Sequence, residues 1–157
     1  MKDFPQLKTK RLLLTELRST DIPRVVQYAS NKEVSLYTLN LPHPFSDKDA
    51  INWMNTAHQG FKSGSKFVFA LRWGPEMEFI GSIGLSVDRK FNRAEISFWI
   101  AEPFWGRGFA TEAVRAALQF GFKELYLNKL TSAHMQKNPA SGKVLKNSGL
   151  AKEGILK

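Results

Sequence analysis

The sequence predicts an α+β fold with a mainly antiparallel sheet and about four flanking helices. Three consecutive β-rich segments stand in the middle of the chain, and directly after them the apolar period changes from 2 to 3.6 residues. The chain has 157 residues and is 43% hydrophobic. This length and composition are typical of one packed globular domain, so we expect residues 1–157 to form a single domain.

The first half of the chain is expected to hold one strand, two helices and a proline-containing loop. In order, these are a strand at 10–17, a helix from residue 19 or 20, a loop at 38–45 and a helix from residue 46. Ser46 and Asp49 have the spacing of an acidic capping box, which predicts a helix start. Gly60 and Gly64 mark the expected end of that helix.

The second half is expected to hold three successive strands, followed by a helix, a strand and a short helix. The expected elements are strands Lys66–Trp73, Glu78–Val87 and Ala94–Ala101, a helix ending near Leu125, a strand Lys129–Met135 and a short helix over about 138–147. Gly74 and Pro75 separate the first two strands and indicate a hairpin. The order of elements predicts an antiparallel meander that leads into one βαβ unit.

Composition narrows the function classes. The net charge of +9 favours anionic partners, or is simply a solvated basic surface. The chain contains no cysteine, and His43, His58 and His134 are spaced too widely for a compact metal site, so we expect no metal. No apolar run approaches the roughly 20 residues that span a membrane, and the charged N-terminus does not resemble a signal peptide. We therefore expect a cytoplasmic protein without a membrane partner.

A strand–glycine–helix junction is the strongest local signal. The expected strand ends near Ile100, and Gly106-Arg107-Gly108 then leads directly into a helix. The free N–H groups and the dipole of a helix start favour a phosphate or pyrophosphate, and Arg107 adds positive charge. Thr111 breaks the GxGxxG pattern, and no GxxxxGK[ST] motif occurs. The alternative is that Gly106 and Gly108 only allow a tight turn and bind no ligand.

Three segments resemble one enzyme family. Trp105–Ala113 (WGRGFATEA) resembles the acetyl-CoA loop of the GNAT N-acetyltransferases, in particular the RimJ/RimL-like branch. Asn138–Leu150 (NPASGKVLKNSGL) and Thr9–Leu17 (TKRLLLTEL) are similar to two further signatures of that branch. The resemblance runs in order through nearly the whole chain. It implies a GNAT fold, with the sheet splayed between its fourth and fifth strands, and acetyl-CoA as acetyl donor.

The resemblance also implies a donor site. The pantetheine arm is expected to pair with the strand at Ser97–Ile100, and the pyrophosphate to meet the amides from Gly106 to Thr111. A side chain at Gly108 is therefore expected to occupy the pyrophosphate position. Trp105 is either part of the site or core packing beneath the loop. The implied donor-binding residues are Ser97, Phe98, Trp99, Ile100, Trp105, Gly106, Arg107, Gly108, Phe109, Ala110, Thr111, Asn138 and Ser141.

Two of the residues carried over from the family are candidates for catalysis. Glu95 matches the family's strand glutamate and is the candidate base; alternatively it pairs with Arg93 or Lys90. Ser141 matches a serine near the donor sulfur, or is an ordinary helix serine. Asn138 matches an asparagine that holds the donor's amide region or a water, and can also cap a helix.

Further departures from the family leave parts of the reaction open. Leu145 stands where many members carry a tyrosine acid, so a dedicated acid is not implied. Relatives continue beyond Glu153–Leu156 for about two more strands. Either the chain is truncated, or another subunit supplies the missing strand in a homodimer.

The branch implies a protein N-terminal α-amine as acceptor, and such an amine needs only a modest base. The loop at 38–45, with His43, is expected to wall the acceptor site. A small-molecule amine, such as an amino acid, polyamine or antibiotic, is the alternative in the same class, although the positive charge disfavours a polycation. A non-catalytic basic module that binds RNA or the ribosome is the alternative in another class. No specific nucleic-acid signature supports it.

Overall fold

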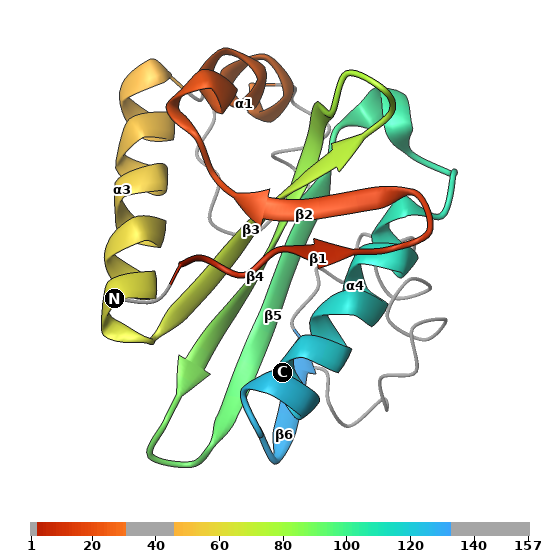
Figure 1. The fold of residues 1–157 in the computed structure, drawn as a ribbon. Coiled ribbons are helices and arrows are strands. Elements are labelled where there is room, and N and C mark those ends of the chain that lie inside the picture. The colour runs from red at the N-terminus through yellow and green to blue at the C-terminus, as the bar shows by residue number, and fades with distance from the viewer. Residues whose placement is uncertain (1–2, 31–45, 133–157) are drawn as a thin grey trace.

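The computed structural model describes residues 3–30 and 46–132, which form a curled sheet with helices on both faces (Figure 1). The strands are β1 (Leu7–Lys8), β2 (Leu12–Glu16), β3 (Lys66–Trp73), β4 (Glu78–Asp88), β5 (Arg93–Ile100) and β6 (Lys129–Ser132). They lie in sequence order, and each pairs antiparallel with the next except β5 and β6, which run parallel. The predicted α+β class and antiparallel meander are confirmed.

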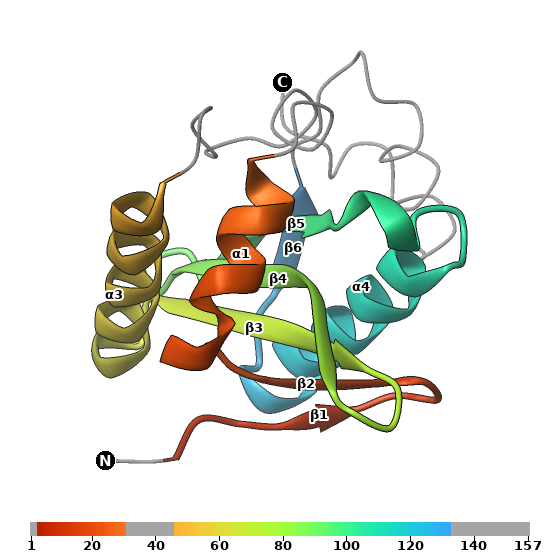
Figure 2. The ribbon, with the colours of Figure 1, turned by 90° about the horizontal axis from the view of Figure 1, so that it is seen from above.

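Three α-helices lie within the described part of the chain: α1 (Ile22–Ala29), α3 (Asp47–Ser63) and α4 (Phe109–Gln119). A 3₁₀ turn, Ser19–Asp21, precedes α1, another, Glu102–Phe104, precedes the glycine loop, and a π-helical turn, Phe120–Glu124, extends α4. Figure 2 shows α1 and α3 on one side of the central strands and α4 on the other. The expected helix over 138–147, the loop at 38–45 and the residues after Ser132 lie outside the described ranges.

Local sequence signals determine the ends of α3. The Ser46 hydroxyl accepts a hydrogen bond from the Asp49 amide (3.2 Å), and the Asp49 carboxylate accepts one from the Ser46 amide (3.0 Å). This is the predicted capping box. The helix ends at Gly64, which has φ +78°, a conformation that glycine adopts at little cost. Gly60, the other predicted end signal, lies inside the last turn.

A buried ion pair joins α1 to the sheet. The Arg72 guanidinium on β3 makes two hydrogen bonds of 2.8 Å to the Asp21 carboxylate, and both residues are buried. Arg72 also donates to the hydroxyl of Thr15 on β2 (2.9 Å). The two charges thus satisfy one another inside the protein, as a buried pair must.

The aromatic core lies between β3 and α4. Phe120, directly after α4, packs against Phe67 and Phe69 of β3, with ring centroids 5.4 and 5.6 Å apart. Phe109, the first residue of α4, is 2% exposed and packs against Trp73 at the other end of β3. Contacts at both ends therefore fix the position of α4 on the sheet, and with it the loop that precedes the helix.

Candidate functional site

One side of β5 has a strand partner over half of its length within residues 3–30 and 46–132. All eight residues of β5 pair with β4, whereas pairing with β6 covers only Arg93–Ile96. Among the described residues, Ser97–Ile100 have β4 as their only strand partner. A strand edge of this kind can bind an extended chain by backbone hydrogen bonds. The predicted splay beyond Ser132 lies outside the described residues.

The side chains of β5 divide between the two faces of the sheet. Trp99 packs against Trp53 of α3, with ring centroids 6.5 Å apart. Because side chains alternate along a strand, Glu95 and Ser97 lie on the same face as Trp99. Their partners across the strand pair on β4 are small: Ser86 lies opposite Glu95, Gly84 opposite Ser97 and Ser82 opposite Trp99. This face therefore has polar groups and little side-chain bulk beside Glu95.

The carboxylate of Glu95 is half-buried, and no described residue forms an ion pair or hydrogen bond with it. The guanidinium of Arg93 instead lies 3.8 Å from Asp88 and stacks over the ring of Phe91. Lys90 also lies over that ring. The alternative prediction, in which Arg93 or Lys90 pairs with Glu95, is therefore wrong.

Beyond the end of β5, the glycine loop opens the first turn of α4. Gly106 has φ +76° and Gly108 has φ +81°, so both adopt the left-handed conformation that other residues rarely take. Both are exposed. The Glu112 amide donates to the Gly108 carbonyl (3.1 Å) in the first turn, so the amides of Phe109 and Ala110 precede it and have no intrahelical acceptor. This geometry fits a phosphate group.

The side chains of the loop have separate roles. Phe109 is core, so only its backbone can meet a ligand. Trp105 is 42% exposed, and its indole N–H donates to the Ile100 carbonyl (2.6 Å), which fastens the loop to the end of β5 and occupies that carbonyl. The guanidinium of Arg107 lies 5.8 Å from the ring of Trp73 and 5.6 Å from that of Phe104.

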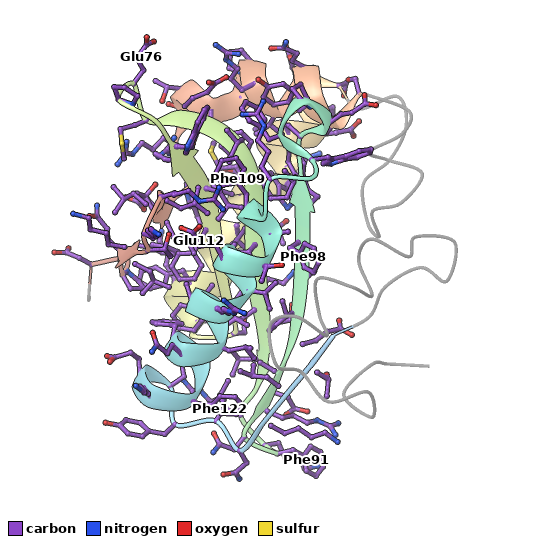
Figure 3. The ribbon with its side chains drawn as sticks, turned by 90° about the vertical axis from the view of Figure 1, so that its right-hand side faces the viewer. Glu76, Phe91, Phe98, Phe109, Glu112 and Phe122 are labelled. Atoms are coloured by element: carbon purple, nitrogen blue, oxygen red, sulfur yellow. The ribbon has the colours of Figure 1, made fainter. Side chains whose placement is uncertain are left out.

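Three residues next to the glycine loop were not singled out by the sequence analysis: Thr9, Arg11 and Glu112. Glu112 accepts hydrogen bonds from the Arg11 backbone amide (2.7 Å), from the Arg11 Nε (2.8 Å) and from the Thr9 hydroxyl. Figure 3 shows Glu112 near the start of α4. Burial alone would raise the pKa of Glu112, but these hydrogen bonds and the charge of Arg11 together hold it below its usual value.

Arg11 also changes the expectation for Gly108. A Cβ atom on Gly108 would lie 3.3 Å from Nη2 of Arg11. A side chain there would press on Arg11 first, rather than entering the expected pyrophosphate position directly. Arg11 and Glu112 are about a hundred residues apart in sequence, so no local spacing pattern could have joined them.

The indole of Trp99 lies near the site. Its Nε1 is buried and makes no hydrogen bond to any of the described residues. The ring itself is 6% exposed and lies between Trp53 and Phe79. An unpaired buried donor of this kind costs about 1–3 kcal/mol.

The remaining sequence candidates are structural or lie outside the described residues. A ring nitrogen of His58 lies 3.1 Å from the Leu17 carbonyl, which joins α3 to the segment after β2. Within residues 3–30 and 46–132, no group of acidic residues and histidines could hold a metal ion, and no helix is long and apolar enough to cross a membrane. His43, His134, Asn138, Ser141 and Leu145 lie outside the described ranges.

Comparison with known proteins decides the family. The model of the acetyltransferase (GNAT) domain matches residues 11–151. The chain belongs to the GNAT acetyltransferase family. This GNAT chain is therefore an acetyltransferase, as the three motif resemblances imply. The expected RimJ/RimL-like branch is consistent with these comparisons, because a relative named for the acetylation of a ribosomal-protein alanine is among the matches.

Relatives of this GNAT domain align over almost its whole length. "Uncharacterized N-acetyltransferase YoaA" of Bacillus subtilis is 33% identical over 98% of the chain and 87% of that protein. The "[Ribosomal protein uS5]-alanine N-acetyltransferase" of Escherichia coli is 26% identical over 97% of the chain and 81% of that protein. The solved "RimL- Ribosomal L7/L12 alpha-N-protein acetyltransferase in complex with Coenzyme A" has a TM-score of 0.82 and 16% identity, covering 92% and 83% of the two chains. This last likeness shows the fold.

Proposed function

We propose that this protein is an acetyl-CoA-dependent N-acetyltransferase whose acceptor is a protein N-terminal α-amine. The observation that carries the proposal is that three features follow one another along the protein: the glycine start of α4, the segment Ser97–Ile100, and Glu95. Among the described residues, Ser97–Ile100 pair only with β4, and no side chain forms an ion pair with the Glu95 carboxylate. The family supports the acetyl transfer. The similarity to an enzyme named for a ribosomal-protein alanine supports the acceptor class.

The donor would bind along the end of β5. Backbone amides of the first turn of α4, with Gly108, would hold its pyrophosphate, because N–H groups at a helix start favour negative charge. The backbone of Ser97–Ile100, apart from the Ile100 carbonyl that the Trp105 indole occupies, would hold the pantetheine arm as an added strand. Ile100 is five positions after Glu95, which is roughly 16 Å along a strand. The donor supplies an acetyl thioester, which would lie near Glu95.

Glu95 would accept a proton from the incoming ammonium, directly or through a water. The Glu95 carboxylate has no ion-pair partner in the part of the chain that the structure describes, and it lies on a face lined by Ser86 and Ser97. An α-amine has a pKa near 7.7–8.0 and a lysine near 10.4, so deprotonating lysine costs about 3.5 kcal/mol more at the same pH. A single carboxylate base is therefore better suited to deprotonate an α-amine than a lysine side chain. Ser141 and Asn138 are proposed to assist the leaving thiolate and to hold the donor amide.

The test is acetyl transfer from acetyl-CoA to a peptide with a free N-terminal alanine. The controls are an N-terminally blocked peptide that contains lysine, and spermidine. We expect transfer to the free α-amine only. Transfer to spermidine alone would assign a small amine instead, and a folded protein that transfers to none of the three would refute the proposal.

Glu95→Gln tests the base. We expect kcat/KM at pH 6 to fall by roughly 10²-fold, a typical contribution of a general base. The loss should shrink towards pH 9, where the α-amine is already neutral, and the Kd of acetyl-CoA should stay nearly unchanged. Glu76→Gln, in the exposed turn between β3 and β4, is the control and should match the parent. Equal rates of Glu95→Gln and parent across pH 6–9 would exclude Glu95 as base.

A further inference from the structure

We propose that Thr9, Arg11 and Glu112 form a clamp that sets the direction of the Arg107–Gly108 peptide, so that the Gly108 amide faces the pyrophosphate of the donor. The turn between β1 and β2, which carries Thr9 and Arg11, thereby becomes part of the donor site. The inference rests on the proposed function, since it assigns positioning residues to the same site.

The clamp holds Arg11 from several directions. Its backbone amide and Nε donate to the two carboxylate oxygens of Glu112 at 2.7 and 2.8 Å, and the Thr9 hydroxyl donates to one of them. Its guanidinium lies 4.3 Å from the centre of the Phe109 ring. With the guanidinium fixed in this way, Nη1 donates to the Arg107 carbonyl (2.9 Å).

Because the peptide bond is planar, the hydrogen bond to the Arg107 carbonyl also determines where the Gly108 N–H points. The carbonyl of Arg107 and the N–H of Gly108 belong to one planar trans unit and point in opposite directions. Because Arg11 binds the carbonyl from behind, the Gly108 N–H points away from Arg11. Glycine accepts positive and negative φ about equally well, so the preferences of the Gly108 backbone alone do not choose this orientation.

The clamp also neutralises a charge that would oppose the ligand. Glu112 lies in the first turn of α4, where its carboxylate would repel a bound pyrophosphate. Three donors surround that carboxylate, and one of them carries the positive charge of Arg11. Loss of the Arg11 side chain should therefore weaken donor binding in two ways. The Arg107–Gly108 peptide is no longer held in one orientation, and the Glu112 carboxylate loses the positive charge beside it.

The experiment compares acetyl-CoA with S-acetylpantetheine, which carries the same thioester but no pyrophosphate. Arg11→Met keeps an unbranched stem but removes the guanidinium and its hydrogen-bond donors. We expect it to raise the KM for acetyl-CoA and the Kd of CoA about tenfold, the typical effect of one charge-assisted hydrogen bond. The kcat at saturation and the kcat/KM with S-acetylpantetheine should not change. Arg24→Met, which removes an exposed arginine paired with Glu78, is the matched control and should affect neither donor.

Two further variants separate the two consequences. Arg11→Lys keeps the charge but cannot bond Glu112 and the Arg107 carbonyl together, so we expect only partial recovery. Adding Glu112→Gln to Arg11→Met should restore the part of the affinity for CoA that was lost through repulsion between the Glu112 carboxylate and the pyrophosphate.

The clamp is overturned if Arg11→Met binds CoA as tightly as the parent, or if it loses activity with both donors alike, which would mean a general loss of structure. A parent protein that binds neither CoA nor inorganic pyrophosphate would overturn the proposed function and the clamp together. A parent that binds CoA but transfers no acetyl group, with Arg11→Met weaker, would support the clamp and refute only the catalytic proposal.

Discussion

Replacing Gly81 by alanine should push β5 away from β4 in the segment proposed to hold the donor. Gly81 lies opposite Ile100 in the strand register. A Cβ atom on Gly81 would lie 2.4 Å from the Trp99 carbonyl oxygen and 3.1 Å from the Cα of Ile100. Both are backbone atoms, so no side-chain rotation can relieve the contact and the strand itself must shift.

Gly84, three residues further along β4, provides a matched control. A Cβ atom there would lie 3.4 Å from a methyl group of Val68 and 3.7 Å from the Ser97 hydroxyl, which are ordinary contacts. Overpacking costs about 1–3 kcal/mol, whereas alanine in place of an unstrained strand glycine stabilises by roughly 0.5–1 kcal/mol. We therefore expect Gly81→Ala to be less stable than Gly84→Ala by about 1–3 kcal/mol.

Urea unfolding measures the free energy of both variants, and calorimetry measures their affinity for acetyl-CoA. Gly81→Ala should lose stability and bind acetyl-CoA more weakly, since the shifted residues belong to Ser97–Ile100. Gly84→Ala should be as stable as the parent or slightly more stable, and it should keep its affinity for acetyl-CoA. Equal unfolding free energies for the two variants would refute the close approach of β4 and β5. A destabilised Gly81→Ala with unchanged affinity would refute the placement of the donor.

Two further predictions concern single groups near the site. The depressed pKa of Glu112 means that its ionised form stabilises the folded state above about pH 4.5 and that this stabilisation is lost as the pH falls through the folded-state pKa. The difference in unfolding free energy between the parent and Glu112→Gln should therefore be largest near pH 7 and shrink by pH 3; a difference that does not change with pH would contradict this assignment. Trp99→Phe removes the unpaired buried indole donor, so thermal unfolding should show a gain of about 1 kcal/mol, offset in part by lost packing. A large loss of stability would show that the indole N–H makes a hydrogen bond in the folded protein.

Local sequence signals predicted the elements whose ends depend on nearby residues. The capping box of Ser46 and Asp49 and the left-handed Gly64 involve contacts within a few positions, so the bounds of α3 could be inferred from the sequence. The bounds of β3 matched the prediction, because a hairpin turn and β-forming residues define them locally. β1 was missed, because a strand of two residues has no pattern of its own and exists only through its pairing with β2.

Only some features of the glycine loop could be predicted from nearby residues. Two glycines before a helix predict a left-handed turn and free amides, and the structure has both at Gly106 and Gly108. The sequence could not show that Arg11 occupies the space beside Gly108, or that the guanidinium of Arg107 lies over Trp73 and Phe104. Those contacts depend on how β2 and β3 lie against α4.

The sequence by itself determined the fold class, the family and the position of the glycine loop, because these depend on short motifs, local hydrogen bonds and the period of apolar residues. Only the tertiary structure decided which face of β5 carries Glu95, which half of that strand pairs with the described part of β6, and which residues contact the glycine loop. The physical reason is that strand register and helix docking are set by packing across the whole sheet. Thr9 and Arg11 contact Glu112 only in the folded protein, because about a hundred residues separate them in the sequence.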